Sequence, residues 1–304
     1  GLQLFYELRD PSSALIYTGT DSDINVTNPA LWWPNGYGKQ PLYTLTIQLK
    51  AGETVLDTRE YRIGLRTVTV SREDDQWGQE FAIMVNGVKI FARGADYIPD
   101  DCFYPRITRE ILERDVKACV FANFNCLRVW GGGYYPSDEF YDLCDEYGIY
   151  MIAECNMESH GTRDTDAVRN GDFSGVVPCD RPEWMDCMLD RVNSMYQRDK
   201  NHAAILIWSC GNESFGGKDI FEMSQFFHKE DPTRLVHYEG LCHDRRYNDT
   251  SDMESQMYPS VEAIKEFLAK DSSKPFICCE YTHAMGNSCG AMHKYTDLTD
   301  TEPK

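Results

Sequence analysis

From about residue 90 onward, short apolar runs alternate with segments of helical periodicity, and this rhythm limits the folds open to the chain. Segments at 108–121, 137–147 and 180–198 place apolar residues three and four apart, as a helix with one buried face requires. The runs between them are largely apolar, which is typical of strands in a parallel sheet covered by helices on both faces. The seven candidate strands read IFARGADY, NCLRVW, IYMIAEC, AILIWSC, VHYEG, SQMY and FICCE.

Several helices have candidate capping residues at their starts. Ser137 precedes one helical segment, and Ser260 precedes the segment between the last two candidate strands. Asp180 and Glu183 have the spacing of a capping box, in which two side chains satisfy free backbone N–H groups at a helix start. We therefore expect the helix that runs to about Arg198 to begin at Asp180.

A (β/α)₈ barrel fits this rhythm better than an open doubly wound sheet. Polar residues recur at the carboxyl end of nearly every candidate strand, where such barrels place their active sites. The nucleotide-binding glycine patterns of open sheets, GxGxxG and GxxxxGK followed by Ser or Thr, do not occur in the sequence. The chain ends soon after the seventh candidate strand. We predict an α/β fold, a TIM barrel truncated before strand 8.

The first 70 residues carry a β pattern instead. LYTLTIQLK and ETVLDTREYRI alternate apolar and polar residues on either side of a glycine turn. We predict part of an immunoglobulin-like β-sandwich over residues 1–70 and the barrel domain over residues 71–304. Asn86-Gly87 separates two apolar runs after the boundary, which predicts a hairpin with a two-residue turn.

The net charge limits the binding partners that the chain can have, and the cysteine content indicates its cellular compartment. The 304 residues carry a formal net charge of −19, which disfavours nucleic acid and anionic membrane as partners because both would repel the chain. No stretch approaches the ~18 apolar residues of a membrane span, and the N-terminus lacks the regions of a signal peptide. The twelve cysteines form no CxxC pair, and many lie in apolar runs. We interpret them as packed thiols of a cytoplasmic protein.

The candidate strand ends supply mainly acidic side chains. The polar residues there are Asp96, Arg128, Glu154, Glu158, His160, Asn212, Glu213, Glu239, Tyr258, Glu280 and His283. No Ser-His-Asp or Cys-His pairing is evident from their spacing. Glycoside hydrolysis with retention needs two carboxyl groups roughly 5–5.5 Å apart, one as proton donor and one as nucleophile.

Glu213 and Glu280 are the candidates for that pair. Glu213 follows the fourth candidate strand and Glu280 ends the seventh, and these strands roughly face each other across an eight-stranded barrel. A single Glu at a strand end is usually a structural, salt-bridged residue. Two of them at the ends of buried strands, beside Asn212 and Tyr281, favour chemistry.

A cation site is a second hypothesis for the same region. Glu158 and His160 stand two residues apart after the third candidate strand, so in an extended segment their side chains point the same way. With a third carboxylate, such a set suits Mg²⁺ or Mn²⁺ better than structural zinc. From spacing alone, a Glu and a His exposed in a surface loop are more common than a cation site. In the same way, cysteines packed in the core are more common than a catalytic thiol.

Several motifs resemble those of glycoside hydrolase family 2. PFICCEYTHAMGNS is similar to the nucleophile segment of that family's beta-galactosidases, and ILIWSCGNES is similar to their acid/base segment. NMESHG, RDKNH, DPTRLVHYEG and QMYPS resemble the intervening segments, in the same order, so the likeness covers about residues 149–295. It implies a sandwich domain before a (β/α)₈ barrel.

The resemblance also implies roles for single residues. Glu213 would be the acid/base and Glu280 the nucleophile, while Glu158, His160 and Glu213 would hold Mg²⁺. Asn212 would bind the sugar 2-hydroxyl and Tyr258 would support the nucleophile. His283 would contact the sugar.

The first half of the chain resembles the beta-mannosidase branch of the family instead. The segments LWWPNGYGKQPLY, VNGVKIFARGADYIPDDCF and LRVWGGGYYPSDEFYDLCDEYGI carry this likeness. The histidine-rich and SHYP-type segments usual in galactosidases read ADYIPDD and WGGGYYP here, and Trp130 stands where mannosidases have their tryptophan. The motifs are thus mixed, as in a lineage of its own or a junction of two related genes near residue 150.

The predicted function is a retaining exo-glycosidase that hydrolyses terminal β-D-galactosides, from an oligosaccharide or simpler β-galactoside. A β-mannosidase of the same family, a non-catalytic carbohydrate-binding fragment and a metal-dependent hydrolase using Glu158 and His160 are the alternatives. A homo-oligomer is a further expectation. The family's N-terminal jelly-roll, eighth strand and C-terminal domains have no counterpart in the sequence, so we expect weak activity at most from this chain alone.

Overall fold

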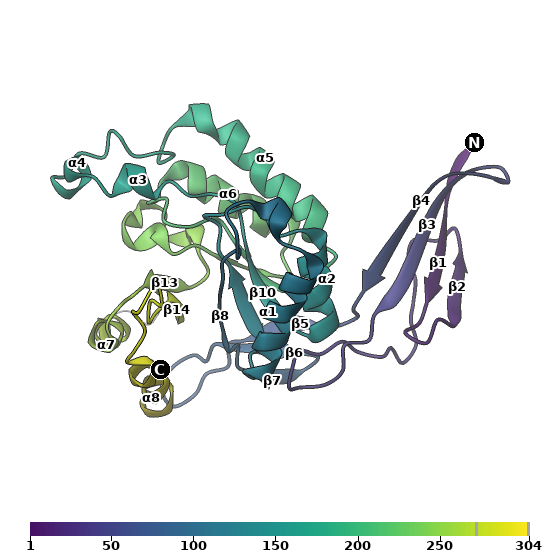
Figure 1. Ribbon diagram of the computed structural model, residues 1–304, viewed down its shortest axis with the longest axis horizontal. Helices are drawn as coiled ribbons and strands as arrows, with labels where there is room; N and C mark the ends of the chain where they lie inside the picture. The colour runs from purple at the N-terminus through teal and green to yellow at the C-terminus, as the bar shows by residue number, and fades with distance from the viewer. Residues whose placement is uncertain (271–272, 303–304) are drawn as a thin grey trace.

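A four-stranded antiparallel sheet forms the N-terminal part of the chain. The computed structural model describes residues 1–270 and 273–302, and Figure 1 shows this sheet standing apart from the helices. Its strands follow the order β2-β1-β3-β4. Gly52 makes the predicted turn between β3 and β4, with a positive φ that glycine adopts without strain. The strands are β1 (Leu2–Arg9), β2 (Leu15–Gly19), β3 (Tyr43–Ala51) and β4 (Thr54–Ile63).

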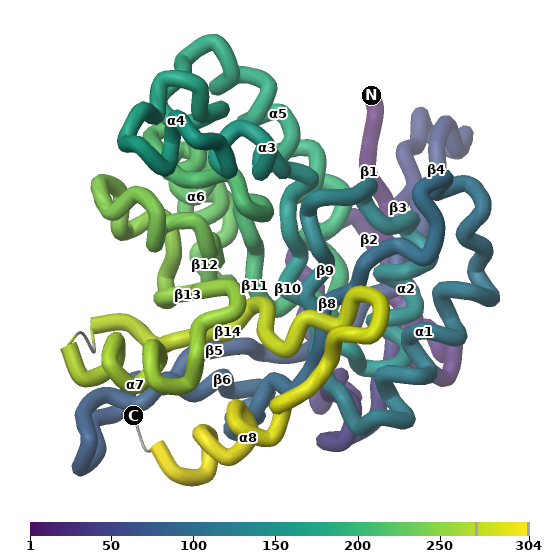
Figure 2. The backbone as a smooth tube through the Cα atoms, turned by 60° about the vertical axis from the view of Figure 1, so that its left-hand side comes forward, coloured from purple at the N-terminus to yellow at the C-terminus, as the bar shows by residue number. Residues whose placement is uncertain are grey.

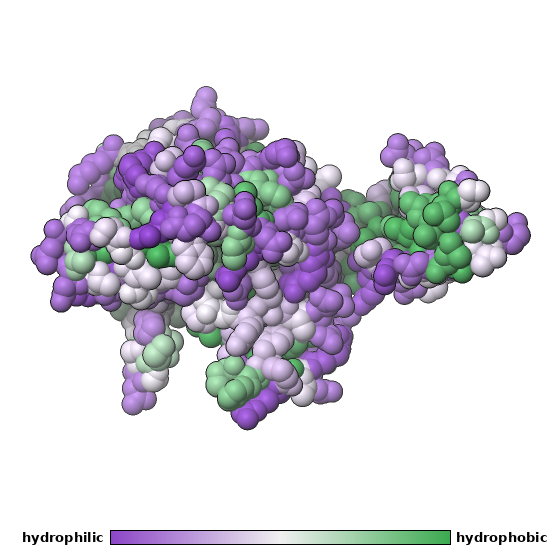
Figure 3. Space-filling view, turned by 90° about the horizontal axis from the view of Figure 1, so that it is seen from above, coloured by the Kyte–Doolittle hydropathy of each residue, from purple (hydrophilic) through white to green (hydrophobic). Residues whose placement is uncertain are grey.

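The sheet is a single layer in the part of the chain that the structure describes. Leu2 is 68% exposed and Leu56 is 54% exposed, although strands of a sandwich bury such side chains between two sheets. Figure 3 shows a hydrophobic patch over this region. The residues therefore supply one face of the predicted sandwich.

A small sheet of order β5-β6-β7 follows, comprising β5 (Val68–Ser71), β6 (Ala82–Val85) and β7 (Val88–Ile90). The predicted hairpin is confirmed, because Asn86 and Gly87 join β6 to β7 and both have positive φ, as a type I′ turn requires. Arg66, just before β5, donates to the carbonyl oxygens of Ala203 and Ile205 at 3.0 Å each. These bonds attach the sheet to the amino-terminal end of the barrel strands.

The barrel prediction is confirmed for seven parallel strands, which occur in chain order. Five are hydrogen-bonded as β12-β11-β10-β9-β8, and β13 pairs with β14 (Figure 2). The order never reverses, so the open doubly wound alternative is wrong. No eighth parallel strand occurs within residues 1–270 and 273–302. The strands are β8 (Gly94–Tyr97), β9 (Cys126–Val129), β10 (Tyr150–Glu154), β11 (Ile205–Ser209), β12 (Leu235–His237), β13 (Glu254–Met257) and β14 (Phe276–Glu280).

The helices lie where the periodicity predicts them, but one predicted start is wrong. The N-cap residue of α5 is Arg181, because Pro182 takes the first helical position, where its missing N–H costs nothing. Asp180 instead accepts a hydrogen bond from the Lys218 backbone N–H, at the start of α6. Ser260 does accept from the Ala263 N–H, at 3.1 Å. The helices are η1 (Tyr104–Arg106), α1 (Arg109–Phe121), α2 (Asp138–Tyr147), α3 (His160–Arg163), α4 (Asp166–Arg169), α5 (Pro182–Asp199), α6 (Lys218–Glu230), η2 (Gly240–Cys242), η3 (Arg245–Thr250), α7 (Val261–Lys270) and α8 (Met292–Thr301).

The cysteines are thiols, and those in the central strands are part of the core. Cys126, Cys155 and Cys210 are buried as predicted, whereas Cys278 and Cys279 are only partly buried. Burial raises the pKa of Cys126 and of Cys155 to about 12, so both stay protonated and unreactive at neutral pH. Among the residues that the structure describes, no helix has the length and apolar content needed to cross a membrane.

Candidate active site

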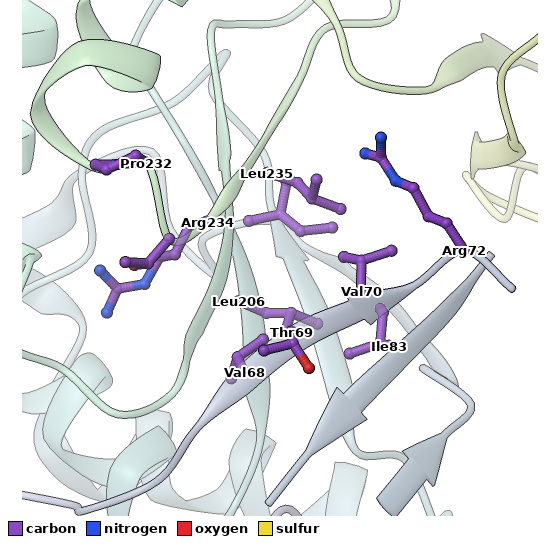
Figure 4. Close-up of a pocket in the computed structure, with 11 residues that line it drawn as sticks. Val68, Thr69, Val70, Arg72, Ile83, Leu206, Pro232, Arg234 and Leu235 are labelled. Atoms are coloured by element: carbon purple, nitrogen blue, oxygen red, sulfur yellow. The ribbon is translucent and has the colours of Figure 1, made fainter. Parts of the chain in front are cut away.

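A largely apolar hollow lies away from the polar strand ends. It has a volume of about 420 Å³ and sits where β5 and β6 meet the amino-terminal ends of β11 and β12. Figure 4 shows Val70, Leu206 and Leu235 around this space, with Arg72 and Arg234 at its margin. Its lining contains no carboxylate. The candidate catalytic side chains lie at the opposite end of the strands.

The carboxyl ends of the strands bring most of the predicted polar residues together, with Arg128 at their centre. Its side chain, at the end of β9, is only 3% exposed. Its guanidinium donates to Glu154 at 2.9 and 2.7 Å, to the Glu280 Oε1 atom at 2.7 Å and to the Asn212 Oδ1 atom at 2.6 Å. Asp96, at 3.2 Å, is a further acceptor. One buried cation thus connects side chains from four strands or the loops after them.

Glu280, at the end of β14, has a donor on each carboxylate oxygen. Arg128 binds Oε1, and the Tyr258 hydroxyl donates to Oε2. The same hydroxyl lies 3.2 Å from the His283 Nδ1 atom. Tyr258 has a positive φ of 55°, and its backbone N–H donates to the Glu280 carbonyl oxygen at 2.8 Å. Strained backbone of this kind often occurs at functional sites. Tyr258 and His283 lie beside Glu280, and the support of the nucleophile by Tyr258 and the contact of His283 with the sugar stay predictions.

Glu213 lies in the loop after β11, in a conformation that the local sequence allows. Gly211 has a φ of 154°, and a Cβ atom there would come within 2.8 Å of the Met157 side chain, so only glycine fits. Two residues on, Glu213 itself has a positive φ of 42°. Its backbone N–H donates to the Glu239 Oε1 atom at 2.5 Å, which holds this conformation.

The Glu213 carboxylate faces two basic side chains from α3. His160 Nδ1 lies 3.0 Å from Oε2, and Arg163 Nη2 donates to Oε1 at 2.7 Å. The Asn212 amide nitrogen lies 3.4 Å from Oε2. Asn212 therefore contacts Glu213 and, through its own oxygen, Arg128. A continuous path of contacts runs from Glu280 through Arg128 and Asn212 to Glu213.

Glu158, His160 and Glu213 form a cluster with the donor set of a cation site. One ligand atom from each lies within 4.8 Å of the others. The Asn212 amide donates to Glu158, and burial raises the pKa of Glu158. Two carboxylates and one imidazole, all partly accessible, fit a hard divalent ion such as Mg²⁺ or Mn²⁺.

Buried titratable groups surround the two carboxylates. Burial raises the pKa of Asp96 and of Glu239 to about 7, and it raises the pKa of Glu154 as well. Burial, with a smaller effect of Arg128, lowers the pKa of His237 to about 3, so the ring is neutral. His237 bridges the hydroxyls of Ser209 and Ser255, and Ser209 donates to Glu154. These groups form a buried layer of hydrogen bonds beneath the site.

Trp130 is placed differently from the other predicted residues. It follows β9, and its ring lies so close to Gly132 and Gly133 that a Cβ atom on Gly132 would collide with it. Within the described residues, its indole makes no hydrogen bond to Glu213 or Glu280. Its role in sugar binding stays a prediction.

Sequence reasoning missed Arg163, Ser209 and His237. Arg163 follows His160 by three residues, and this spacing on a helix would have placed both on one side. Ser209 and His237 are the last residues of β11 and β12, which the strand pattern marks. They gave no signal as site residues, because a buried Ser or His in an apolar strand more often only satisfies a hydrogen bond.

Two family models match the chain. The model described as "Glycosyl hydrolases family 2, TIM barrel domain" matches residues 79–304. The model described as "Glycosyl hydrolases family 2" matches residues 7–66. The first match includes every strand of the barrel, and the second includes most of the N-terminal sheet.

Curated relatives include several beta-galactosidases. The beta-galactosidase of Priestia megaterium is 41% identical over 283 residues, which make up 92% of this chain and 26% of that protein. The beta-galactosidase of Clostridium acetobutylicum is 48% identical over 195 residues, 64% of this chain and 21% of that protein. The chain thus spans about a quarter of the length of the curated relatives it matches.

Solved structures share the fold. The beta-D-mannosidase from Dictyoglomus thermophilum superposes with a TM-score of 0.64 at 25% identity, over 88% of this chain and 38% of that one. A beta-glucuronidase of Bacteroides uniformis superposes with a TM-score of 0.70, over 99% of this chain and 40% of that one. The second is 17% identical, so its likeness concerns the fold alone.

Proposed function

The chain belongs to glycosyl hydrolase family 2, and from this premise we propose that the intact protein is a retaining glycosidase that releases terminal β-galactose. Glu280 is the nucleophile and Glu213 the acid/base. The observation that carries the proposal is the contact path from Glu280 through Arg128 and Asn212 to Glu213, at one end of one barrel.

The reaction is a double displacement. Glu280 attacks the anomeric carbon while Glu213 protonates the departing oxygen, which leaves a covalent sugar ester on Glu280. Water then attacks the same carbon, and Glu213 takes its proton. Arg128 and Tyr258 donate to the two oxygens of Glu280 and so fix the direction in which this carboxylate faces.

We infer that the sugar is galactose because curated relatives at about 40% identity are beta-galactosidases. Asn212 would bind the 2-hydroxyl and His283 a further hydroxyl. The second candidate is a β-mannoside. It is favoured by Trp130 after β9 and by the likeness to the mannosidase structure.

Glu158, His160 and Glu213 would hold Mg²⁺. A bound divalent ion would supply a fixed positive charge next to the acid/base. The chain's own part is to present three ligand atoms from a loop, the start of α3 and the loop after β11.

A cytoplasmic location and a homo-oligomeric state belong to the same proposal. The buried thiols of the barrel strands suit a reducing compartment, and the net charge of −19 suits a neutral substrate.

Trapping the covalent intermediate tests the proposal. The chain and the intact protein are incubated with 2-deoxy-2-fluoro sugar fluorides of β-galactose, β-mannose and β-glucuronic acid, followed by intact mass measurement and peptide mapping. We expect one galactosyl adduct, on Glu280, and none in Glu280→Gln. An adduct from the mannosyl reagent alone would favour the second candidate.

Two other outcomes oppose the proposal. An adduct on a residue other than Glu280 would show that the nucleophile is wrong. No adduct from any reagent with the intact protein, together with no hydrolysis of the matching aryl glycosides, would favour a non-catalytic carbohydrate-binding protein.

A further inference from the structure

Arg163 is the side chain that most directly constrains the proposed acid/base. Its Nη2 atom donates to the Glu213 Oε1 atom at 2.7 Å, and the Arg163 side chain is only 16% exposed. Its Nε atom is buried and has no hydrogen-bond partner among the described residues. Burying a guanidinium costs free energy unless an anion compensates, and Glu213 is the carboxylate that it contacts.

The same carboxylate belongs to the candidate cation cluster. Its other oxygen, Oε2, lies 3.0 Å from His160 Nδ1, and Glu158 completes the set within 4.8 Å. His160 and Arg163 are the first and last residues of α3, so one short helix supplies both a candidate metal ligand and a cation. Glu213 thus stands between a fixed cation of the chain and a site for a diffusible one.

A second contact keeps the guanidinium in this position. Arg163 Nη1 lies 2.8 Å from the His243 Nε2 atom. A guanidinium can only donate, so Nε2 accepts, and this requires a neutral ring. Burial, and then Arg163 itself, lowers the pKa of His243, in agreement with that assignment. His243 therefore holds Arg163 near the cluster independently of Glu213.

We propose that Arg163 is a positioning residue that serves as an internal cation for Glu213 and competes with the divalent ion at the Glu158–His160–Glu213 cluster. It competes by occupying Oε1 and by charge repulsion, which is weakly screened at a partly buried site. The importance of Glu213 for turnover rests on the proposed function, whereas the competition for ions does not.

Ion titrations of the 304-residue chain test the competition. Mn²⁺ binding is measured by electron paramagnetic resonance and Mg²⁺ binding by calorimetry, for the wild type, Arg163→Met, Arg163→Gln and Arg163→Lys. We expect the dissociation constant for Mn²⁺ to fall about tenfold or more in the two neutral variants, the order of effect that removing one nearby charge produces. Arg163→Lys keeps the charge and stays near the wild type.

Arg169→Gln is the matched control, because Arg169 is 59% exposed and, among the residues that the structure describes, forms ion pairs with Asp164 and Asp166 only. It should leave ion affinity unchanged. Adding Glu213→Gln to Arg163→Met should abolish the gain. Unchanged or weaker Mn²⁺ binding in folded Arg163→Met would overturn the proposal, as would an equal gain in Arg169→Gln.

A measurement on the wild type covers the case in which both neutral variants fail to fold. The ¹⁵N signal of the Arg163 guanidinium, assigned by its loss in Arg163→Lys, should shift as Mg²⁺ saturates the chain. A signal that does not move at saturation would contradict competition. None of these measurements uses turnover. A failure of the competition proposal is therefore distinguishable from a failure of the glycosidase proposal.

Discussion

The two proposed catalytic carboxylates share one end of the barrel but are held in different ways. Glu280 is held at the ends of strands: Arg128 lies near the end of β9, and Tyr258 comes directly after β13. Glu213 is held by side chains outside the strands, because Arg163 and His160 come from the short helix α3. The Glu280 side of the site is therefore part of the barrel framework. The Glu213 side depends on the connecting segment between β10 and α5, which contains α3.

This difference matches the two tasks in a double displacement. A nucleophile has to meet one carbon atom from one direction, and a rigid framework of strands maintains that geometry. The acid/base gives up a proton in one step and accepts one in the next, so its partners have to tolerate both states. The arrangement predicts that changes on the Glu280 side impair the chain more severely than changes on the Glu213 side.

Glu280→Gln should have the largest effect on activity. It keeps the size of the side chain but removes the attacking oxygen, so kcat/KM of the intact protein for an aryl β-galactoside should fall by about a thousandfold or more. Glu266→Gln is the matched control, since Glu266 is 72% exposed on α7. Circular dichroism should be unchanged in both variants. Near-normal turnover in Glu280→Gln would place the nucleophile elsewhere.

Arg128→Met should have the largest effect on stability. It leaves Glu154 and Glu280 without their shared cation, and breaking a buried ion pair costs about 3–5 kcal/mol in the free energy of unfolding. Arg163→Met, on the other side of the site, should cost less, about 1–2 kcal/mol, because the Arg163 guanidinium contacts one carboxylate, whereas that of Arg128 contacts three. Urea unfolding of both variants measures the difference. Equal losses of unfolding free energy in the two variants would remove the distinction between the barrel framework and the connecting segment.

The sequence predicted the framework side well and the other side less completely. A parallel strand imposes a simple rule, that its last residues lie at the functional end, and this rule was sufficient to select Arg128, Glu154 and Glu280. This rule does not place the residues of the connecting segment after β10. The partner of Glu213 that comes from there, Arg163, depends on how the loop returns to the barrel, which no local periodicity specifies.

The fold shows the same limit on a larger scale. Alternating strands and helices predicted the barrel, and Asn86-Gly87 predicted its hairpin. The proposed start of α5 at Asp180 was wrong, because Asp180 bonds the start of α6 instead. A capping pattern describes local competition for N–H groups, and a contact with a residue 38 positions away lies outside it.

Glu239 allows a test by pH of how the Glu213 side is held. Burial raises its pKa from 4.5 to about 7, so the folded chain keeps a proton that the unfolded chain loses between these values. The stability that this group contributes is full below pH 4.5 and is lost as the pH rises through about 7. Glu239→Gln still accepts from the Glu213 N–H but cannot ionise. It should reduce the loss of stability between these pH values by on the order of 1–3 kcal/mol.

Glu154→Gln is the counterpart of that variant on the Glu280 side. It would leave Arg128 short of a charged partner and should destabilise the chain at every pH in this window. Urea unfolding at a series of pH values compares the two. If Glu239→Gln keeps the full pH dependence of the wild type, Glu239 is not the group responsible for it.

Tyr258→Phe should have the smallest of these effects, and it tests how much of the nucleophile's position depends on one hydrogen bond. The Tyr258 hydroxyl donates to Glu280, and burial together with Glu280 raises its pKa, so it stays protonated through the neutral range. Losing one donor to a carboxylate that keeps Arg128 should lower kcat about tenfold, as expected for a charge-assisted hydrogen bond. KM should change little, because the hydroxyl acts on Glu280.

Tyr295→Phe is the control for this variant, since the Tyr295 hydroxyl donates to the Pro259 carbonyl and not to a carboxylate. A loss in Tyr258→Phe as large as that of Glu280→Gln would mean that Arg128 alone cannot orient the nucleophile. The Glu280 side would then depend on a tyrosine that is 48% exposed, and the contrast with the Glu213 side would disappear.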